Sequence, residues 1–413
     1  MKVLVVSAVF PPEPMVSART SAQIAAHLAG DGHKVQVLAP FPNRPGGMLY
    51  PGHRRRLFAR QQHSDGYELT YCFSTLAPQS SLRQRFAENI SFGLTSSLAT
   101  LFSTRPDVIY SNSWPIFATG LIWLVARLRG IPLVISVQDV YPESLTAQGR
   151  PAQGTLLRTM RRLDSLIART AHHLVVISQH FADLYRADRG VPPQRISVVP
   201  NWAESDSIDL ATDQQTWRRE RGIGDNHFVL AYGGNIGVAA GVETVIEALA
   251  QLPHLPDLRL LIAGEGSRLQ ACRDLADQQD ERRVLFHTPW ALAETSAVLR
   301  AADVLVLPTR GNQSIASVPS KLISYLLAAR PVIALVLPES EIAHIINKSG
   351  GGWVIPPDRP DLLAEKISTV ARLDAATRTH MGQAGRIYAL QHLTREVCLP
   401  RLVNIILSAG SKS

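Results

Sequence analysis

Residues 303–334 read DVLVLPTRGNQSIASVPSKLISYLLAARPVIA, and the fold follows from this stretch. The short apolar run Asp303 to Leu307 is typical of a strand that is buried on both faces. A polar loop follows, and Pro319-Ser320-Lys321 then opens a segment whose apolar residues have the spacing of a helix with one buried face; they are Leu322, Ile323, Leu326 and Leu327. Arg330-Pro331 ends that helix, and Val332 to Leu337 predicts another buried strand. The stretch is therefore a strand–loop–helix–strand unit.

The start of this predicted helix carries a small polar residue and a lysine, Ser320 and Lys321. The first turn of a helix offers unpaired backbone N–H groups and a partial positive charge, which together favour a phosphate. The alternative is an ordinary helix start with a solvated lysine.

The length of 413 residues predicts two domains, because one hydrophobic core seldom grows so large. A hydrophobic content of 46% with 18% charged residues is typical of a globular chain. The three cysteines (Cys72, Cys272 and Cys398) are scattered, which indicates a reducing cytoplasm and no metal site. We expect no signal peptide and no spanning helix, since the longest apolar run, 114–126, is shorter than the roughly 20 residues that spanning requires.

Positive charge is concentrated in the first half of the chain. Residues 1–200 contain 21 Lys and Arg against 11 Asp and Glu, whereas residues 201–413 contain 21 against 23. The sequence shows no nucleic-acid-binding module and no interleaving of aromatic with basic residues, so nucleic acid is not the expected partner. The asymmetry favours an anionic membrane surface or an anionic lipid-linked substrate.

One segment of the basic half has two interpretations. Residues 83–102 carry apolar side chains at helical spacing, with Arg83 and Arg85 at the start, and they follow a loop that contains Arg54-Arg55-Arg56. The segment is either a core helix with one wet face or a surface helix that rests on a bilayer beside the arginine loop.

Both halves alternate short apolar strands with helical segments, which predicts parallel sheets built from βαβ units. An acidic, irregular segment separates the two series. The predicted organisation is an N-terminal domain at 1–202, a linker at 203–227, a C-terminal domain at 228–390, and a C-terminal helix at 391–413 that is able to pack back on the N-terminal domain.

Loops that leave the carboxyl ends of strands hold the candidate site residues, because ligands of open α/β sheets bind there. Gly233-Gly234-Asn235 lies between a strand and a helix, where glycines allow close approach to a phosphate, although a tight structural turn explains them equally well. Asp139 and Glu143 follow a buried strand, and either carboxylate could accept a proton from a substrate hydroxyl. A helix-capping aspartate and a surface glutamate are the alternative.

Seven motifs occur in an order that resembles glycosyltransferase family 4. They are FPPEP at 10–14, DVYPES at 139–144, ISQHF at 177–181, VVPNW at 198–202, YGGNIG at 232–237, AGEG at 263–266 and VPSKLISYLLAARPVIA at 318–334. More narrowly, the chain is similar to transferases that build bacterial O-antigen, capsule and colanic-acid-type polysaccharides, including fucosamine transferases. The resemblance implies the α/β fold called GT-B, with two facing Rossmann-like, doubly wound domains.

The resemblance also implies a reaction and a set of site residues. A sugar would move from a nucleotide-diphosphate donor, UDP-linked, to a lipid-linked saccharide acceptor at the cytoplasmic face of the plasma membrane, with no metal and no cofactor. Asp139 and Glu143 would be catalytic, and the acceptor would contact Glu13 and Arg19. The donor would contact Gly233, Gly234, Asn235, Glu265, His287, Trp290, Ser320 and Lys321.

The chain departs from the broader family at three positions. Two glutamates eight residues apart are replaced by Ala316 and Ser324, and a lysine before the glycine at 241 is replaced by Ala240. The contacts to the ribose and to the donor sugar are therefore left unassigned.

Two alternatives stay open: a UDP-sugar 2-epimerase on the same architecture, and a binding subunit of a polysaccharide assembly complex that has lost catalysis.

Overall fold

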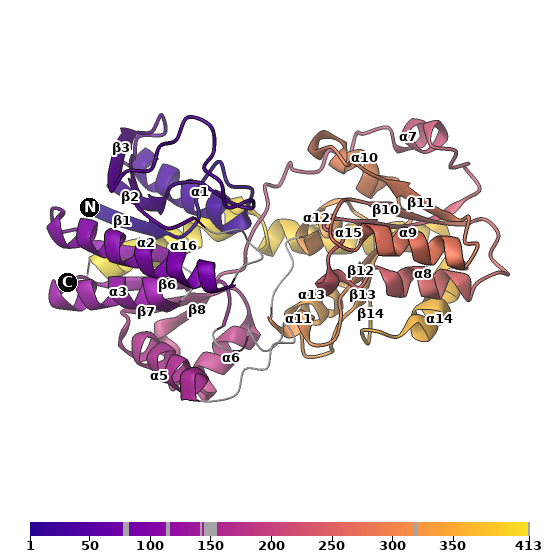
Figure 1. The fold of residues 1–413 in the computed structure, drawn as a ribbon. Helices are drawn as coiled ribbons and strands as arrows, with labels where there is room; N and C mark the ends of the chain where they lie inside the picture. The colour runs from indigo at the N-terminus through magenta and orange to yellow at the C-terminus, as the bar shows by residue number, and fades with distance from the viewer. Residues whose placement is uncertain (77–81, 113–115, 141–142, 144–154, 317–320, 412–413) are drawn as a thin grey trace. The chain divides into compact units, whose positions relative to one another are not determined.

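The structure is a computed structural model that describes residues 1–76, 82–112, 116–140, 143, 155–316 and 321–411. The chain divides into two compact units, one formed by residues 1–201 with 398–413 and the other by residues 202–397. Each unit contains a largely parallel sheet with helices packed against it (Figure 1). The predicted α/β architecture with two sheets is confirmed.

The sheet of the first unit has the strand order β3-β4-β2-β1-β5-β6-β7-β8, and all its pairings are parallel except that of β3 with β4. Neither β3 nor β4 was predicted from the sequence; the exposed edge strand β3 is mostly polar and lacks an apolar pattern. The strands are β1 (Lys2–Ser7), β2 (Lys34–Pro40), β3 (Phe58–Gln62), β4 (Glu68–Cys72), β5 (Val108–Asn112), β6 (Leu133–Val137), β7 (His173–Val176) and β8 (Ile196–Val198).

The helices of the first unit connect these strands, and the last one comes from the end of the chain. From residue 398 onward, α16 groups with this unit. The helices are α1 (Val16–Gly30), α2 (Leu82–Phe102), α3 (Ile116–Leu128), α5 (Thr155–Thr170), α6 (Gln179–Ala187) and α16 (Arg395–Gly410).

Helix α2 exposes the apolar stripe that its sequence displays. Ile90, Leu94, Leu98 and Leu101 are all exposed, while Ser96 and Thr100 on the opposite side are fully buried. The interpretation of this stripe as a core-facing surface is therefore wrong, and α2 is a surface helix with an inverted pattern.

The sheet of the second unit has the order β11-β10-β9-β12-β13-β14 and is parallel throughout. Residues 202–227 group with this unit, and Trp217 of α7 is buried in its core. The strands are β9 (Phe228–Gly233), β10 (Leu258–Ala263), β11 (Val284–His287), β12 (Val304–Pro308), β13 (Val332–Leu335) and β14 (Gly352–Ile355). The helices are α7 (Gln214–Glu220), α8 (Glu243–Ala250), α9 (Leu269–Gln278), α10 (Thr295–Arg300), α11 (Gln313–Ala316), α12 (Lys321–Leu327), α13 (Glu341–Ser349), α14 (Pro360–Ala371) and α15 (Ala375–His392).

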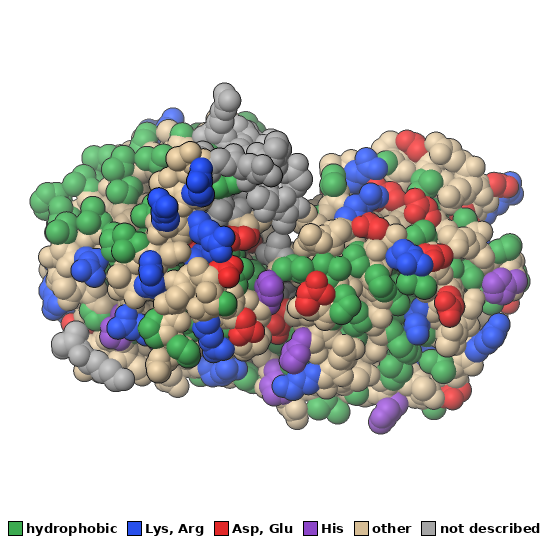
Figure 2. Space-filling model, turned by 90° about the horizontal axis from the view of Figure 1, so that it is seen from below, with side chains coloured by type: hydrophobic (Ala, Val, Ile, Leu, Met, Phe, Trp, Pro, Cys, Tyr) green, Lys and Arg blue, Asp and Glu red, His purple; other side chains and the backbone are tan. Residues whose placement is uncertain are grey.

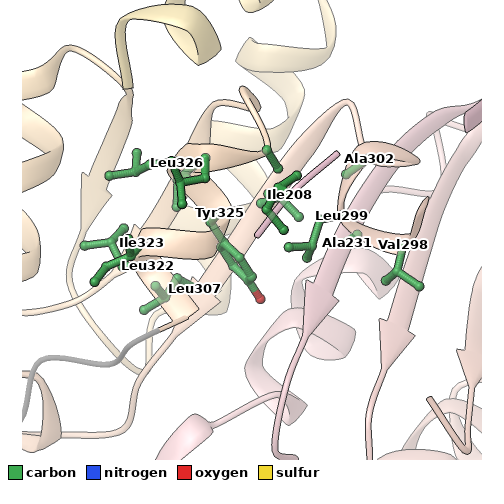
Figure 3. Packing of buried hydrophobic residues seen from close by; sticks show 14 of the residues in the cluster. Ile208, Ala231, Val298, Leu299, Ala302, Leu307, Leu322, Ile323, Tyr325 and Leu326 are labelled. Carbon is green, nitrogen blue, oxygen red and sulfur yellow. The ribbon is translucent and has the colours of Figure 1, made fainter. Parts of the chain in front are cut away.

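Both faces of the second sheet are covered by apolar side chains. In β9, Val229 and Ala231 belong to one buried cluster, and Leu230 and Tyr232 belong to the other. A strand buried in this way on both faces has a continuous apolar sequence, which is why the pattern predicted it. Figure 3 shows one of the clusters, in which Tyr325 of α12 lies among neighbouring apolar side chains with its hydroxyl group at the edge of the group.

The strand order places a topological switch point in each sheet. In the second unit the chain runs from β9 to β10 on one side and later returns to β12 on the other side of β9. In the first unit β1 has β2 on one side and β5 on the other. Ligands of open α/β sheets bind at the carboxyl ends of such strand pairs. No described helix is long and apolar enough to cross a membrane.

Candidate functional site

The loop after β9 is held against the loop after β10 by backbone contacts. The Gly234 N–H donates to the Ala263 carbonyl at 2.9 Å, and the Ile236 N–H donates to the Glu265 carbonyl at 2.8 Å. Gly264 has φ +138°, and a Cβ at this position would lie 1.9 Å from the Gly234 carbonyl oxygen. The close approach of the two loops therefore requires glycine at 264.

Tyr325 fixes the end of β9 from the side of α12. Its hydroxyl group accepts from the Gly233 N–H at 2.8 Å and donates to the Gly233 carbonyl at 2.9 Å. A Cβ at Gly233 would lie 3.1 Å from the Trp290 ring, so the small residue lets the indole pack on the backbone. These contacts fix the backbone at the end of β9, which is called the β9 platform below.

Lys321 lies over the β9 platform at the switch point between β9 and β12. Its Nζ donates to the Tyr232 hydroxyl at 2.7 Å and lies 4.5 Å from the centroid of the Tyr232 ring. The same hydroxyl donates to the Asn235 carbonyl at 2.6 Å. A Cβ at Gly234 would lie 3.1 Å from Nζ, so the ammonium group faces the glycine loop directly.

The electrostatics of Lys321 indicate an anion site. The side chain is largely withdrawn from water, and this desolvation lowers its pKa from 10.5 to about 8. Among the described residues no carboxylate contributes to its environment. A desolvated cation without an acidic partner is costly, and a bound anion would relieve that cost. Ser320, predicted beside it, lies outside the described residues.

Two arginines that the sequence analysis missed lie along the same loop. The buried carboxylate of Glu243 accepts from Arg268 Nε at 2.6 Å, and its other oxygen lies 3.2 Å from Arg310 Nη2. Burial alone would raise the pKa of Glu243, but its hydrogen bonds and the two arginines hold it below its ordinary value. The three groups therefore carry a net positive charge.

Backbone contacts place the two arginines beside residues 236–241. The Arg268 N–H donates to the Ile236 carbonyl at 2.9 Å, and the Arg310 N–H donates to the Ala239 carbonyl at 3.1 Å. A Cβ at Gly241 would lie 2.7 Å from Arg310 Cγ. Arg310 thus brings a cation next to Ala240, where the broader family has lysine. Its position directly after an apolar strand was the sequence signal that could have identified it.

The other predicted donor residues lie at or just beyond the carboxyl ends of β9, β10 and β11. The Trp290 indole Nε1 is buried and has no hydrogen-bond partner among the described residues. His287 ends β11, and its Nε2 lies 3.1 Å from Glu294 Oε2. The side chains of Asn235 and Glu265 are exposed. The structure therefore brings together Gly233, Gly234, Trp290 and Lys321, with His287 further along the sheet edge.

In the first unit, Glu13 anchors the loop after β1. Its Oε1 accepts from the backbone N–H groups of Asn43 and Arg44, both at 2.9 Å, whereas its buried Oε2 has no hydrogen-bond partner among the described residues. Burial raises the pKa of Glu13. Arg44 in turn pairs with Glu88 of α2 at 2.9 Å. Arg19, also predicted to contact the acceptor, is exposed on α1.

Asp139 and Glu143 occupy different environments. Burial raises the pKa of Asp139 to about 7, and the charge of Arg85 opposes this shift. Both carboxylate oxygens of Glu143 lie 2.7 Å from Nη2 of Arg189, whose buried side chain also donates to Asp164 at 2.8 Å. The pKa of Asp139, near 7, suits a general base. The carboxylate of Glu143 is instead engaged in an ion pair with Arg189.

Comparisons with known proteins agree with this arrangement. The family model described as "Glycosyl transferase 4-like domain" matches residues 17–202, and "Glycosyl transferases group 1" matches residues 227–372. The probable glycosyltransferase WbjE of Pseudomonas aeruginosa is 26% identical over 78% of this chain and 79% of its own. The putative colanic acid biosynthesis glycosyl transferase WcaI of Escherichia coli K12 is 24% identical over 92% and 96%.

A solved structure shows the same fold over the whole chain. HepE of Anabaena, in complex with UDP, superposes with a TM-score of 0.73 at 16% identity and covers 99% of this chain and 100% of its own. The two family domains occur in order along most of the chain; the first covers all of the first sheet except β1, and the second covers the second sheet. The chain therefore belongs to the glycosyltransferases that combine a 4-like domain with a group 1 domain, and it has their GT-B fold.

Proposed function

We propose that this glycosyltransferase moves a sugar from a UDP-linked donor to a lipid-linked saccharide during the synthesis of a bacterial surface polysaccharide. Lys321 carries the proposal, because it is a desolvated cation with no acidic partner among the described residues, and it faces a glycine loop at the switch point of the second sheet. The similarity to WbjE and WcaI supports the reaction class, and the role of WcaI in colanic acid biosynthesis supports the polysaccharide setting. The UDP complex of HepE supports the nucleotide.

In this proposal the donor diphosphate lies along the glycine loop of the second unit. Lys321 contacts it beside Gly234, and the net positive charge of Arg268, Glu243 and Arg310 neutralises it further along the loop. Positive groups that are already in place stabilise the charge that develops on the leaving diphosphate. The side chains of this site therefore neutralise the leaving group, and no metal is part of the proposal.

The nucleoside side of the donor belongs near Trp290. The buried indole N–H has no partner among the described residues and is able to donate to a ligand atom. The ring packs on Gly233, so a ligand on the glycine loop would come close to it. His287 and the exposed side chains of Asn235 and Glu265 are secondary candidates for donor contacts.

The acceptor belongs to the first unit, with Asp139 as the proposed base. Its raised pKa makes the carboxylate a matched proton acceptor near neutral pH. Oε2 of Glu13, which has no partner among the described residues, is a candidate hydrogen-bond acceptor for a sugar hydroxyl, and Arg19 is exposed nearby in the sequence. Because Glu143 is paired with Arg189, we assign it to positioning the 139–143 segment.

We further propose that the protein acts as a peripheral protein at the cytoplasmic face of the plasma membrane.

The test combines nucleotide binding with turnover. Isothermal titration of the full chain with UDP and a panel of UDP-sugars should show binding that Lys321→Met weakens and Lys348→Met leaves unchanged, since Lys348 is exposed on α13. Incubation with the binding sugar and a lipid-linked saccharide extract should extend the saccharide. Binding without turnover would support a binding subunit instead, and release of an epimerised free sugar without acceptor would support an epimerase.

A further inference from the structure

The apolar side of helix α2 faces solvent, although an apolar side normally packs against the core. Leu94 is 56% exposed and Phe102 is 80% exposed, and Ile90, Leu98 and Leu101 are exposed on the same side of the helix. These positions recur every three or four residues, so they form one continuous stripe along the helix. Such a stripe on a free surface costs hydrophobic free energy unless another apolar phase covers it.

The buried side of α2 is mostly polar, with Phe92 among its buried residues, and most of its polar groups have partners, Ser97 Oγ being without one among the described residues. Ser96 Oγ donates to the Phe92 carbonyl at 2.6 Å, and Thr100 Oγ1 donates to the Ser96 carbonyl at 2.7 Å. Glu88 is buried in an ion pair with Arg44. Hydrogen bonds and an ion pair thus hold the polar side of α2 inside the unit, and the leucines lie on the opposite, exposed side.

Helix α3 extends the apolar surface of α2. The two helices lie side by side in Figure 1 and touch where a Cβ at Gly93 would lie 2.8 Å from Ala118 Cα and 2.9 Å from Leu121 Cδ1. Leu124 and Leu128 of α3 are 47% and 73% exposed. The exposed leucines of both helices and Phe102 thus form one surface, here called the α2–α3 ridge.

Exposed arginines lie on α3 and on a segment that contacts α2. Arg55 donates to the Ser74 carbonyl and lies 4.8 Å from the Phe73 ring, and residue 75 is bonded to α2 through Ser91. Arg127 is exposed on α3, on the side that carries Trp123. Figure 2 shows, at the left, apolar side chains gathered on the surface of the first unit beside a group of basic ones.

The positive charge of the first unit indicates which kind of partner covers the α2–α3 ridge. This unit contains 23 Lys and Arg against 11 Asp and Glu, whereas the second contains 19 against 23. A second copy placed on the ridge would bring arginines against arginines. An anionic bilayer instead supplies both an apolar phase for the leucines and phosphate groups for the arginines.

We propose that the α2–α3 ridge is the surface by which the protein inserts into the interface of an anionic membrane, with Arg54, Arg55, Arg56 and Arg127 contacting lipid headgroups. The inference rests on the proposed function for its choice of a membrane as the setting. It goes further in assigning the contact to named side chains and in requiring both an apolar and a charged component.

The experiment is a flotation assay of the purified full chain with vesicles of phosphatidylcholine, with or without phosphatidylglycerol. The double variant Leu94→Gln/Leu128→Gln should lower the partition coefficient on anionic vesicles at least about tenfold, since each leucine buries apolar area in the interface. The variant Arg54→Gln/Arg56→Gln should lower it about fivefold per arginine. Ile387→Gln is the matched control, because Ile387 is an exposed apolar residue on α15 of the second unit.

Equal partition coefficients of the leucine variant and the wild type on anionic vesicles would overturn the inference. A wild type that does not bind anionic vesicles would overturn it as well. A dimer in sedimentation velocity that the leucine variant converts to monomer would show that a second copy covers the ridge, which also overturns it. UDP titration of the same preparations separates the two proposals. Vesicle binding without UDP binding would leave the ridge intact and refute the donor site, and the opposite result would refute only the ridge.

Discussion

Replacing Lys321 with methionine should make the protein more stable and its nucleotide binding weaker. The change removes an ammonium group whose pKa is lowered from 10.5 to about 8, while it keeps a side chain of similar length. A lysine that serves mainly to hold Tyr232 would give the opposite stability change. The sign of the effect therefore distinguishes a ligand-binding role from a structural one.

The magnitude follows from the pKa shift. A shift from 10.5 to about 8 corresponds to about 3 kcal/mol of unfavourable free energy for the charged form in the folded protein. The lost hydrogen bond to Tyr232 offsets about 1 kcal/mol of this, so the net gain is about 2 kcal/mol at pH 7. For a unit of this size the apparent Tm should rise by about 4–8 °C.

The pH dependence gives an independent check on the cause. Between the folded pKa of about 8 and the unfolded pKa of 10.5, the unfolded state binds more protons than the folded state. The free energy of unfolding of the wild type therefore rises with pH across this window, and that of the variant does not. The stability difference should be full below pH 8 and should narrow as the pH approaches 10.5.

The assay is thermal unfolding at pH 7 and pH 9, combined with titration of UDP at pH 7. The affinity for UDP should fall about 10- to 150-fold in Lys321→Met, as expected for the loss of a hydrogen bond between charged groups. Lys348→Met, at an exposed position of α13, should change neither quantity appreciably. A variant that melts below the wild type at pH 7 and binds UDP equally well would refute the reasoning.

Three further predictions test other parts of the two sites. Arg310→Gln should weaken UDP binding about tenfold in the same titration, because it removes one of the two cations held by the buried Glu243. The rate of sugar transfer should fall as the pH drops below about 7, where Asp139 takes up a proton, and Asp139→Asn should abolish it, whereas Glu143→Gln should leave the midpoint of this profile in place. Gly264→Ala should lower the apparent Tm and abolish UDP binding, because its Cβ would lie 1.9 Å from a carbonyl oxygen, and Gly46→Ala, whose Cβ would meet nothing within 4 Å, is the control for both readouts.

The sequence alone predicted the fold class and the strands that carry the second site. The strands β9 and β12 are buried on both faces, so their apolar runs are continuous and easy to recognise. The loops at their ends follow from the rule that ligands bind beyond the carboxyl ends of parallel strands. Gly233, Gly234 and Lys321 were identified as candidates in this way, and the structure places them together.

The electrostatic state of the candidate residues could not be predicted from the sequence. Asp139 and Glu143 are four residues apart and chemically alike, yet one has a raised pKa and the other is paired with Arg189. The difference arises from burial and from an arginine 46 positions away in the chain. Arg268 and Arg310 were missed for the same reason, because only the fold brings them to Glu243.

Helix α2 shows which properties the sequence determines and which ones depend on the tertiary structure. Its sequence determined that it is a helix and that one side is apolar, because the spacing of its leucines is a local property. Only the tertiary structure decided which side is buried, since that depends on the partners that the rest of the unit offers to each side. The hydroxyl groups of Ser96 and Thr100 donate to backbone carbonyls of the same helix, and Glu88 forms an ion pair with Arg44. The leucines lie on the opposite, exposed side.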